Sequence, residues 1–362
     1  MLPGSATTSS NRPRRPKRRV FTMISVLVAF TLLLAACGGD SGDDPADSAT
    51  TAVVDIDTTT ESSETTASES TGGSETRTVE TGMGPVEVPA NPQRIVALDI
   101  RVLQLLDELE APLVGTQTRT GGVWTELSDE AQALPSIWVR GEDIDLEAVV
   151  ALEPDLIVGG GLGDGNEDLY PQLSEIAPTV LAAADGDWRD LLREVAVAVD
   201  LTDKAEELIA GVEERMPDLE AAIAERWPEG VQITLLRVRD DLRITQVADR
   251  NTSSGPWLLN TIDAISVTGD LRNVEEDGIS PEQLREADGD VILYFGGGGG
   301  SASEQDDEFL LNLIDNPLWD GLTAVQGERA YAVDSDIWFD GRGVTAAHLA
   351  IDDLMEYVAN AP

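Results

Sequence analysis

Three side chains that commonly build catalytic and metal sites are scarce in this sequence. The chain of 362 residues has one cysteine (Cys37), one histidine (His348) and two lysines (Lys17 and Lys204). A disulfide framework needs paired cysteines, and zinc sites and Cys–His catalysis need several Cys or His side chains. The phosphate-binding loop of nucleotide hydrolases needs the motif G-K-[ST], which is absent. These classes of site are therefore excluded within the chain.

Positive charge is also scarce. The sequence has 24 Lys and Arg against 68 Asp and Glu, which gives a formal net charge of −44. Nucleic-acid binding needs a basic stripe to neutralise phosphates, and the body of the chain has none. We therefore expect no nucleic-acid partner. The basic residues that do cluster lie near the beginning of the chain: Arg12, Arg14, Arg15, Lys17, Arg18 and Arg19.

An apolar run, residues 20–36, follows this basic cluster, and no acidic residue occurs before Asp40. The run is too short for a comfortable transmembrane helix, and the pattern is typical of a signal peptide over residues 1–36. Its last part, LAACG (34–38), resembles a bacterial lipobox, which predicts cleavage before Cys37 and diacylglycerol on its thiol. We expect a lipid-anchored protein on the outer face of the cell membrane. The segment RRVF (18–21) also resembles a twin-arginine signal, so both export routes remain open.

Residues 37–77 are dominated by Ser, Thr, Asp, Glu and Gly and contain no aromatic residue. Such a segment cannot bury enough apolar surface to offset its ordering entropy. We predict an acidic, disordered tether that holds a globular head away from the membrane.

From residue 78 onward, apolar runs typical of buried strands alternate with helical patterns, which predicts parallel sheets covered by helices. Two helical segments, 188–199 and 203–227, follow each other without a strand. Asp203 and Glu206 fit a capping box, and Pro217 should kink or break the second helix. We predict an α/β fold with two Rossmann-like lobes, 78–185 and 229–362, joined by the helical connection 186–228. The predicted strands are 94–98, 112–115, 155–159, 179–182, 231–238, 242–247, 290–295 and 330–333, and the other predicted helices are 102–109, 146–152 and 343–358.

Several phrases of the head resemble one protein family. They are VPANPQRIVALD (88–99), DLEAVVALEPDLI (145–157), NPLW (316–319) and RAYAV (329–333), followed by Trp338 and a final helix. Together, in this order and behind a lipobox, they resemble the solute-binding proteins of iron–siderophore ABC importers over residues 78–362. The resemblance implies two α/β lobes joined by a single long helix, with the ligand in the cleft between them. It also implies a partner, the transmembrane permease. The family includes binders of cobalamin, haem and bare metal ions.

The residues narrow that choice of ligand. Bare Zn or Mn sites in this fold class use several histidines, whereas His348 is alone in an apolar-rich segment and is expected to pack. Bare ferric iron could use tyrosine oxygens, but only Tyr170, Tyr294, Tyr331 and Tyr357 exist. A preformed ferric chelate is the leading ligand. No cofactor is expected, because the iron comes only as part of the bound siderophore.

An anionic chelate calls for fixed positive charge. The guanidinium of arginine can bind carboxylate, catecholate or hydroxamate oxygens with paired hydrogen bonds. Arg140 resembles the arginine that binds siderophore oxygens in hydroxamate-binding relatives, although its spacing to Glu147 is one residue longer. Arg237 and Arg239 follow the first strand of the second lobe, where relatives have another ligand-facing arginine, and their equal parity could put both on one face. The alternative for each arginine is an ion pair with a nearby acid.

Aromatic residues are expected to line the same cleft. The pair Trp338 and Phe339 occupies a strand end where the family has a cleft aromatic, and Trp124 lies in a Gly-rich loop after a strand. Ligands of open α/β folds bind beyond such strand ends. Trp257 and Trp319 are expected in the core.

Two glutamates match the residues through which family members dock on their permease, one in each lobe. Glu147 lies in DLEAV and Glu282 in SPEQL. Ser280 and Pro281 also predict a helix start that would expose Glu282. The alternative is an acid that only stabilises a helix N-terminus.

The sequence thus predicts a monomeric receptor, not an enzyme, that captures a ferric siderophore for an ABC permease. Cobalamin or haem in the same transport role is the main alternative. An exported carboxylate-dependent hydrolase is a weaker one, since paired acids can be drawn in any acidic chain and G-x-S-x-G is absent. A surface adhesin or sensor that keeps the fold but has lost transport is the last alternative.

Overall fold

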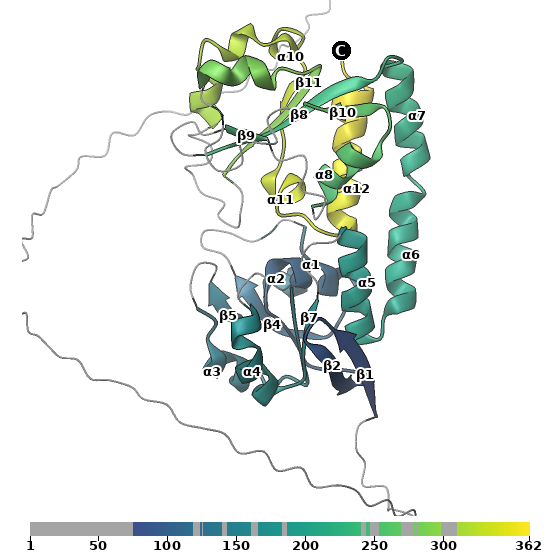
Figure 1. Cartoon of the computed structure of the whole chain (residues 1–362), viewed down its shortest axis with the longest axis vertical. Helices are drawn as coiled ribbons and strands as arrows, with labels where there is room; N and C mark the ends of the chain where they lie inside the picture. Colours follow the sequence, from purple (N-terminus) through teal and green to yellow (C-terminus); the bar gives the residue numbers. More distant parts are fainter. Residues whose placement is uncertain are drawn as a thin grey trace, which may run out of the picture. The chain divides into compact units, whose positions relative to one another are not determined.

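The computed structural model describes residues 75–118, 124, 126–139, 143–160, 166–182, 187–239, 244–246, 253–268, 279, 281–297 and 310–362 (Figure 1). All of them belong to one compact unit, Glu69–Pro362. The predicted signal peptide, Cys37 and nearly all of the predicted tether lie outside the described residues. The first strand, β1 (Thr76–Thr81), includes the last two residues of the predicted tether.

The first lobe contains a parallel sheet with the strand order β5-β4-β3-β6-β7. Alternate side chains point to opposite faces, so Ile95 and Ala97 belong to one buried cluster while Val96 belongs to another. The predicted strands β3, β6 and β7 are confirmed to within one residue. The bounds are β3 Ile95–Ala97, β4 Leu113–Thr118, β5 Ser136–Val139, β6 Leu156–Gly160 and β7 Thr179–Ala182.

Helices cover both faces of this sheet. On one face, α1 (Ile100–Glu108) and α5 (Trp188–Val199) share a buried cluster with the strands. On the other face lie α3 (Leu146–Ala151) and α4 (Asn166–Ile176). Strands buried on both sides read as continuous apolar runs, which is why the sequence predicted them. Five elements of this lobe were not predicted: β1 and its antiparallel partner β2 (Gly84–Pro89), the short helix α2 (Asp129–Gln132), β5 and α4.

The second lobe repeats this plan with the strand order β10-β8-β11-β12, all parallel. A further strand, β9, pairs antiparallel with the carboxyl end of β8. Helices α8 (Ser254–Thr261) and α12 (Val344–Leu354) cover one face, and η3 (Pro281–Ala287), η4 (Trp319–Gly321) and α10 (Thr323–Gln326) cover the other. The strand bounds are β8 Val231–Val238, β9 Ile244–Gln246, β10 Ile265–Val267, β11 Val291–Gly296 and β12 Ala330–Ala332. Of these five strands, only β10 was not predicted.

The lobes are connected by helices that run alongside both of them (Figure 1). After α5 come α6 (Thr202–Glu213) and α7 (Met216–Arg226), and Pro217 lies in the first turn of α7. The expected long helix is therefore interrupted just before Pro217, as predicted. The expected capping box is wrong: α6 begins at Thr202, and Leu201 caps it without a side-chain hydrogen bond. Glu206 instead binds Arg193 of α5, with 2.8 Å between Oε1 and Nε.

Candidate ligand-binding site

One carboxylate links the carboxyl ends of β3 and β6. Asp99 caps α1 and accepts hydrogen bonds from the backbone N–H groups of Arg101 (3.1 Å) and Val102 (3.3 Å). Its second oxygen accepts a hydrogen bond from the backbone N–H of Gly160, the last residue of β6. Ligands of open α/β sheets bind beyond such strand ends. Asp99 therefore fixes the backbone where the first lobe would meet a ligand.

Arg101 lies against the same strand ends. Its Nε is 3.4 Å from Oδ1 of Asp99, and 13% of its side chain is exposed. A Cβ atom at position 160 would lie 2.8 Å from Nη2 of Arg101, so glycine is required there for the guanidinium to approach. Arg101 was not among the predicted site residues. The acid–arginine spacing of DIR (99–101), directly after a strand, is the signal that could have found it.

In the second lobe the structure brings two of the predicted residues together. The guanidinium carbon of Arg237, near the end of β8, lies 4.2 Å from the ring centroid of Phe339. The Nε of Arg237 donates a hydrogen bond to the carbonyl of Gly297, just after β11. Phe339 in turn packs against Phe295, with 5.8 Å between ring centroids. A guanidinium held on an aromatic face is already oriented, so its side chain loses little conformational entropy when a ligand binds.

Arg239 follows β8 by one residue and is partly buried. Its Nε is buried and has no hydrogen-bond partner within the part of the chain that the structure describes. An unsatisfied buried donor costs about 1–3 kcal/mol, which a ligand oxygen could recover. Arg239 is therefore the predicted arginine whose surroundings most favour an anion. Arg140 lies outside the described residues.

The two predicted tryptophans face the core. Trp338 is fully buried, donates a hydrogen bond from Nε1 to Oδ2 of Asp353 (2.7 Å) and packs against Gly255. It ends the helix α11 (Ser335–Trp338) and does not lie on a strand end as expected. Trp124 is also buried, among the apolar residues of the first lobe. Neither indole presents an open surface to a ligand, because both side chains are buried.

The predicted core aromatics are confirmed. Trp257 is buried and meets Trp188 edge to face, with 5.6 Å between centroids, and Trp319 packs on Tyr294. His348 is half-buried, and its Nδ1 lies 3.1 Å from Nη1 of Arg215. Burial and the charge of Arg215 lower the pKa of His348.

Hydrogen bonds join the two lobes between α1 and the start of α12. The carboxylate of Glu108 in α1 accepts hydrogen bonds from the backbone N–H groups of Val344 (3.0 Å) and Thr345 (2.6 Å), which begin α12. Gln104, one turn earlier, accepts a hydrogen bond from the backbone N–H of Arg342 (3.0 Å). Burial of the charged form raises the pKa of Glu108 to about 7, against the opposing effect of the two backbone hydrogen bonds. These bonds fix the first lobe to the N-terminus of α12.

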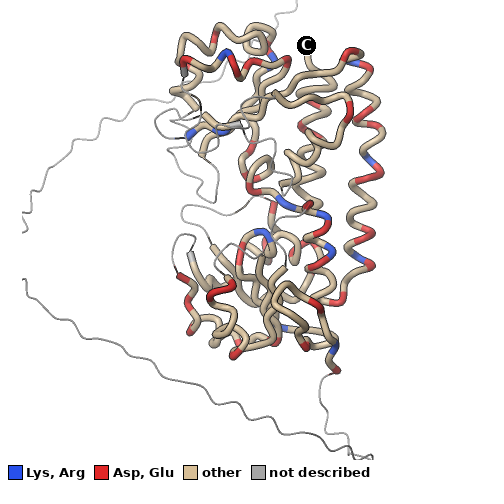
Figure 2. The backbone as a smooth tube through the Cα atoms, in the orientation of Figure 1, with Lys and Arg blue, Asp and Glu red and all other residues tan. Residues whose placement is uncertain are grey.

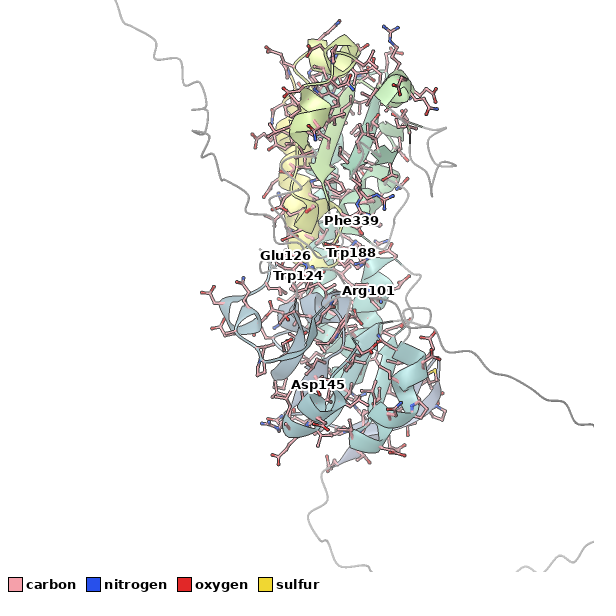
Figure 3. All side chains as sticks on the ribbon, turned by 90° about the vertical axis from the view of Figure 1, so that its left-hand side faces the viewer. Arg101, Trp124, Glu126, Asp145, Trp188 and Phe339 are labelled. Carbon is pink, nitrogen blue, oxygen red and sulfur yellow. The ribbon has the colours of Figure 1, made fainter. Side chains whose placement is uncertain are left out.

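Basic positions gather between the two sheets. Figure 2 shows several of them there, with acidic positions both among them and along the rest of the coloured chain. Figure 3 shows Arg101, Trp124, Glu126 and Phe339 near the junction of the lobes, and Asp145 farther from the junction in the first lobe. Within the described residues no group of three or more His, Cys, Asp or Glu side chains is arranged to hold a metal ion. None of the described helices has the length and hydrophobicity needed to cross a bilayer.

Comparison with known proteins agrees with this architecture. The family model described as periplasmic binding protein matches residues 95–337. The chain belongs to the periplasmic binding protein family. As a member of this family of solute-binding proteins it is not an enzyme.

Two relatives from Bacillus subtilis and one solved structure extend the comparison of this binding protein. A lipoprotein named as probable siderophore-binding lipoprotein YfiY is 30% identical, over 82% of this chain and 92% of the relative. The Fe(3+)-citrate-binding protein YfmC is 24% identical, over 79% of this chain and 87% of its own length. The crystal structure of Staphylococcus aureus SirA complexed with staphyloferrin B has 20% identity and a TM-score of 0.66, covering 78% of this chain and 98% of SirA. The likeness to SirA shows that the two chains share a fold.

The two predicted docking glutamates of this binding protein occupy equivalent places in the two lobes. Glu147 in α3 and Glu282 in η3 are both exposed. Each precedes the first residue of a central strand, Leu156 of β6 or Val291 of β11, by nine residues. Both short helices therefore lead into the amino ends of their sheets, opposite to the strand ends where Arg101 and Arg239 lie.

The same equivalence extends to a pair of aspartates. Asp155 accepts hydrogen bonds from the backbone N–H groups of Gln93 (2.7 Å) and Arg94 (2.9 Å), just before β3. Asp290 accepts one from Gln232 of β8 (2.8 Å). Both aspartates lie eight residues after the glutamate of their lobe. This internal repeat could have been found in the sequence, and it was missed because the two phrases share few identical residues.

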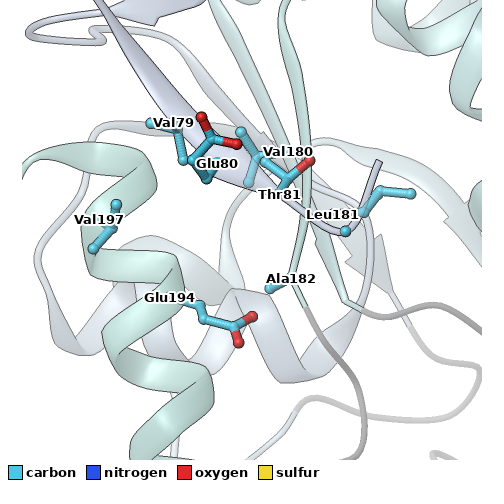
Figure 4. A pocket seen from close by; sticks show the side chains of 9 residues that line it. Val79, Glu80, Thr81, Val180, Leu181, Ala182, Glu194 and Val197 are labelled. Atoms are coloured by element: carbon cyan, nitrogen blue, oxygen red, sulfur yellow. The ribbon is translucent and has the colours of Figure 1, made fainter. Parts of the chain in front are cut away.

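A pocket of about 300 Å³ lies elsewhere, between the β1 hairpin, β7 and α5 (Figure 4). Its walls include Val79, Val180 and Val197, and Glu80 and Glu194 also line it. None of the predicted ligand-binding residues lines this pocket. Its small size and its carboxylates make it unsuited to an anionic chelate.

Proposed function

We propose that this binding protein is a lipid-anchored extracytoplasmic receptor that binds a ferric siderophore and delivers it to an ABC-type permease. The observation that supports this most directly is the buried, unpartnered Nε of Arg239 among the described residues, two residues from the oriented guanidinium of Arg237. In a chain with a net charge of −44, buried positive charge at the strand ends favours an anionic, oxygen-rich ligand.

The names of the relatives support an iron chelate in particular. One of the Bacillus subtilis relatives is named for siderophores and the other for ferric citrate. Ferric citrate presents carboxylate oxygens, and ferric siderophores present carboxylate, hydroxamate or catecholate oxygens. All of these oxygens match the paired donors of a guanidinium. The choice among these oxygen chemistries is left to the binding assay.

We assign ligand contact to Arg101, Arg237, Arg239 and Phe339, together with Arg140 as the sequence predicts. Trp124 and Trp338, which the sequence also predicts as ligand-binding residues, stay in the proposal with both side chains buried. The anchor is Cys37, behind a signal peptide over residues 1–36 and followed by the tether. The permease meets Glu147 and Glu282, one from each lobe, at the sheet ends opposite to the ligand.

The first prediction concerns ligand binding. Arg239→Ala is expected to weaken binding of the ferric chelate about tenfold or more, because a charge-assisted hydrogen bond contributes about 1.5–3 kcal/mol. The measurement is tryptophan-quenching titration of residues 37–362 carrying Cys37→Ser. The panel consists of ferric citrate, a ferric hydroxamate, a ferric catecholate, cobalamin and haemin. Arg226→Ala is the matched control, because Arg226 lies on the ring of Trp227, away from the strand ends.

Each outcome of this titration is informative. Saturable quenching by one ferric chelate that weakens in Arg239→Ala but not in Arg226→Ala supports the proposal. Quenching by cobalamin or haemin alone would keep the transport role and replace the ligand. No binding of any panel member would contradict the siderophore assignment.

A further inference from the structure

The segment 339–345, here called the strap, leads from α11 into the first residues of α12. Two fully buried serines at the start of α8 bind its backbone. The hydroxyl of Ser253 donates a hydrogen bond to the carbonyl of Phe339 (2.8 Å). The hydroxyl of Ser254 donates to the carbonyl of Gly343 (2.8 Å) and accepts a hydrogen bond from the N–H of the same residue (3.0 Å). The strap is therefore fixed to its own lobe through α8.

The strap is also held from the first lobe, by Gln104 and Glu108 of α1. Gln104 binds the backbone N–H of Arg342, and Glu108 binds those of Val344 and Thr345. The two side chains are four residues apart, so they lie on one face of α1. Both are buried, and loss of either acceptor would leave strap N–H groups unsatisfied away from water. The position of α1 therefore determines where the strap lies.

One end of the strap carries the ring on which a ligand arginine lies. Phe339 is buried, and its ring supports the guanidinium of Arg237 at 4.2 Å. The chain turns tightly just after this ring, because a Cβ atom at position 341 would lie 2.5 Å from the carbonyl oxygen of Ile337. A shift of the strap would thus move Phe339 and, with it, the guanidinium.

The helix that holds the strap carries a ligand arginine of its own. Arg101 lies in the first turn of α1, and Gln104 follows it by three residues, or about 4.5 Å along the helix axis. Figure 3 shows Arg101 and Phe339 near the junction of the lobes. One rigid helix therefore connects Arg101 of the first lobe to the support of Arg237 in the second.

We propose that Gln104 and Glu108 are positioning residues for the ligand, which hold the strap so that Arg237 stays at a fixed spacing from Arg101. The inference rests on the proposed function and adds a source of specificity to it. A chelate whose oxygens span this spacing binds without reorganising either lobe, whereas a smaller or larger one does not. Gln104 and Glu108 thus act on the ligand through Phe339 and contribute to the choice among ferric chelates.

The test is tryptophan-quenching titration of residues 37–362 carrying Cys37→Ser, with ferric citrate, a ferric hydroxamate and a ferric catecholate. Gln104→Leu removes one strap acceptor at similar volume, and Glu108→Gln gives up one of two accepting oxygens. Thr179→Val is the matched control, because it removes a buried hydrogen bond to the carbonyl of Ala177 (3.0 Å) at the amino end of β7. Gln104→Leu is also combined with Phe339→Leu, and far-ultraviolet circular dichroism verifies that each variant is folded.

Gln104→Leu and Glu108→Gln should each weaken binding of the preferred chelate about fivefold, as loss of one buried hydrogen bond allows. The less preferred chelates should lose less, so that the affinities converge. Thr179→Val should bind as the wild type does. In the Phe339→Leu background, Gln104→Leu should change the affinity by less than about twofold, because the ring through which it acts is gone.

Three results would overturn the inference. They are wild-type affinity in both Gln104→Leu and Glu108→Gln, an equal loss in Thr179→Val, and an undiminished effect of Gln104→Leu in the Phe339→Leu background. The last result would show that Gln104 acts by a route other than Phe339. All three leave the proposed function intact, whereas a wild-type protein that binds none of the chelates would overturn the proposed function and this inference with it.

Discussion

At the scale of single residues, Glu108 shows how a buried carboxylate can join two lobes. The N-terminus of a helix attracts negative charge, and the first N–H groups of α12 have no partner within their own helix. Glu108 satisfies two of them from the other lobe. Gly343 makes this approach possible: its φ of +120° suits glycine, and a Cβ atom there would lie 2.5 Å from Oε2 of Glu108.

The raised pKa of Glu108 predicts a pH dependence of stability. The pKa rises from 4.5 to about 7 on folding, so between these values the folded protein holds a proton that the unfolded chain releases. The contribution of Glu108 to the free energy of unfolding therefore falls as the pH rises through this window, by at most about 3 kcal/mol. Relative to the wild type, Glu108→Gln should gain stability between pH 5 and pH 8, as measured by urea unfolding.

The control for this measurement is Glu110→Gln. Glu110 lies two residues further along the chain and pairs with Lys204 at an exposed position. Its stability relative to the wild type should change by no more than a few tenths of a kcal/mol over the same pH range. If the difference between Glu108→Gln and the wild type is also independent of pH, the assigned pKa is wrong.

Among the candidate ligand residues, those governed by local pattern could be predicted and those governed by packing could not. The spacing of Arg237 and Arg239 after a strand is visible in the sequence, and the structure places both near the end of β8. The burial of Trp338 could not be foreseen, because it depends on the close approach of Gly255 from α8 and on Asp353 from α12. Both partners are distant in sequence.

At the scale of elements, the strands whose bounds the sequence predicted most closely are those with mostly buried residues. β8 and β7 match their predicted bounds because their runs, VQITLLRV and TVLA, are mostly apolar or β-branched. β10 has only partly buried or exposed residues, and β1 alternates with a single buried side chain, Val79. Short, half-buried strands of this kind are specified by their neighbours more than by their own composition, and the sequence did not predict β1 or β10.

The interruption between α6 and α7 supports a prediction at this scale. Pro217 lies in the first turn of α7, where its missing N–H and fixed φ are tolerated. Pro217→Ala should therefore change the free energy of unfolding by less than about 1 kcal/mol. Ala221→Pro, at an exposed position in the middle of the same helix, should cost about 3 kcal/mol. Urea unfolding monitored by far-ultraviolet circular dichroism compares the two, and equal losses would contradict this account of the break.

At the scale of the whole described unit, the two lobes share one apolar core. A single buried cluster includes Ile95 and Leu156 of the first sheet, Ile233 and Leu293 of the second sheet, and Trp188 of α5. The alternation of strands and helices predicted two lobes, but it could not predict this continuity. The contact between α6 and α12 depends on the packing of segments more than 100 residues apart.

A shared core predicts cooperative unfolding of both lobes. Residues 75–362 should unfold in one urea transition, with coincident curves from circular dichroism and tryptophan fluorescence, which has probes in both lobes. The fragment 75–185 should show no cooperative transition, because it lacks α5 and so exposes the faces of α1 and of the sheet that α5 covers. Two separated transitions in the longer chain, or cooperative unfolding of the fragment, would show that each lobe is stable alone. In that case the bonds from Glu108 and Gln104 to the start of α12 would join two independent domains, and their removal would change the relative mobility of the lobes without lowering the stability of either.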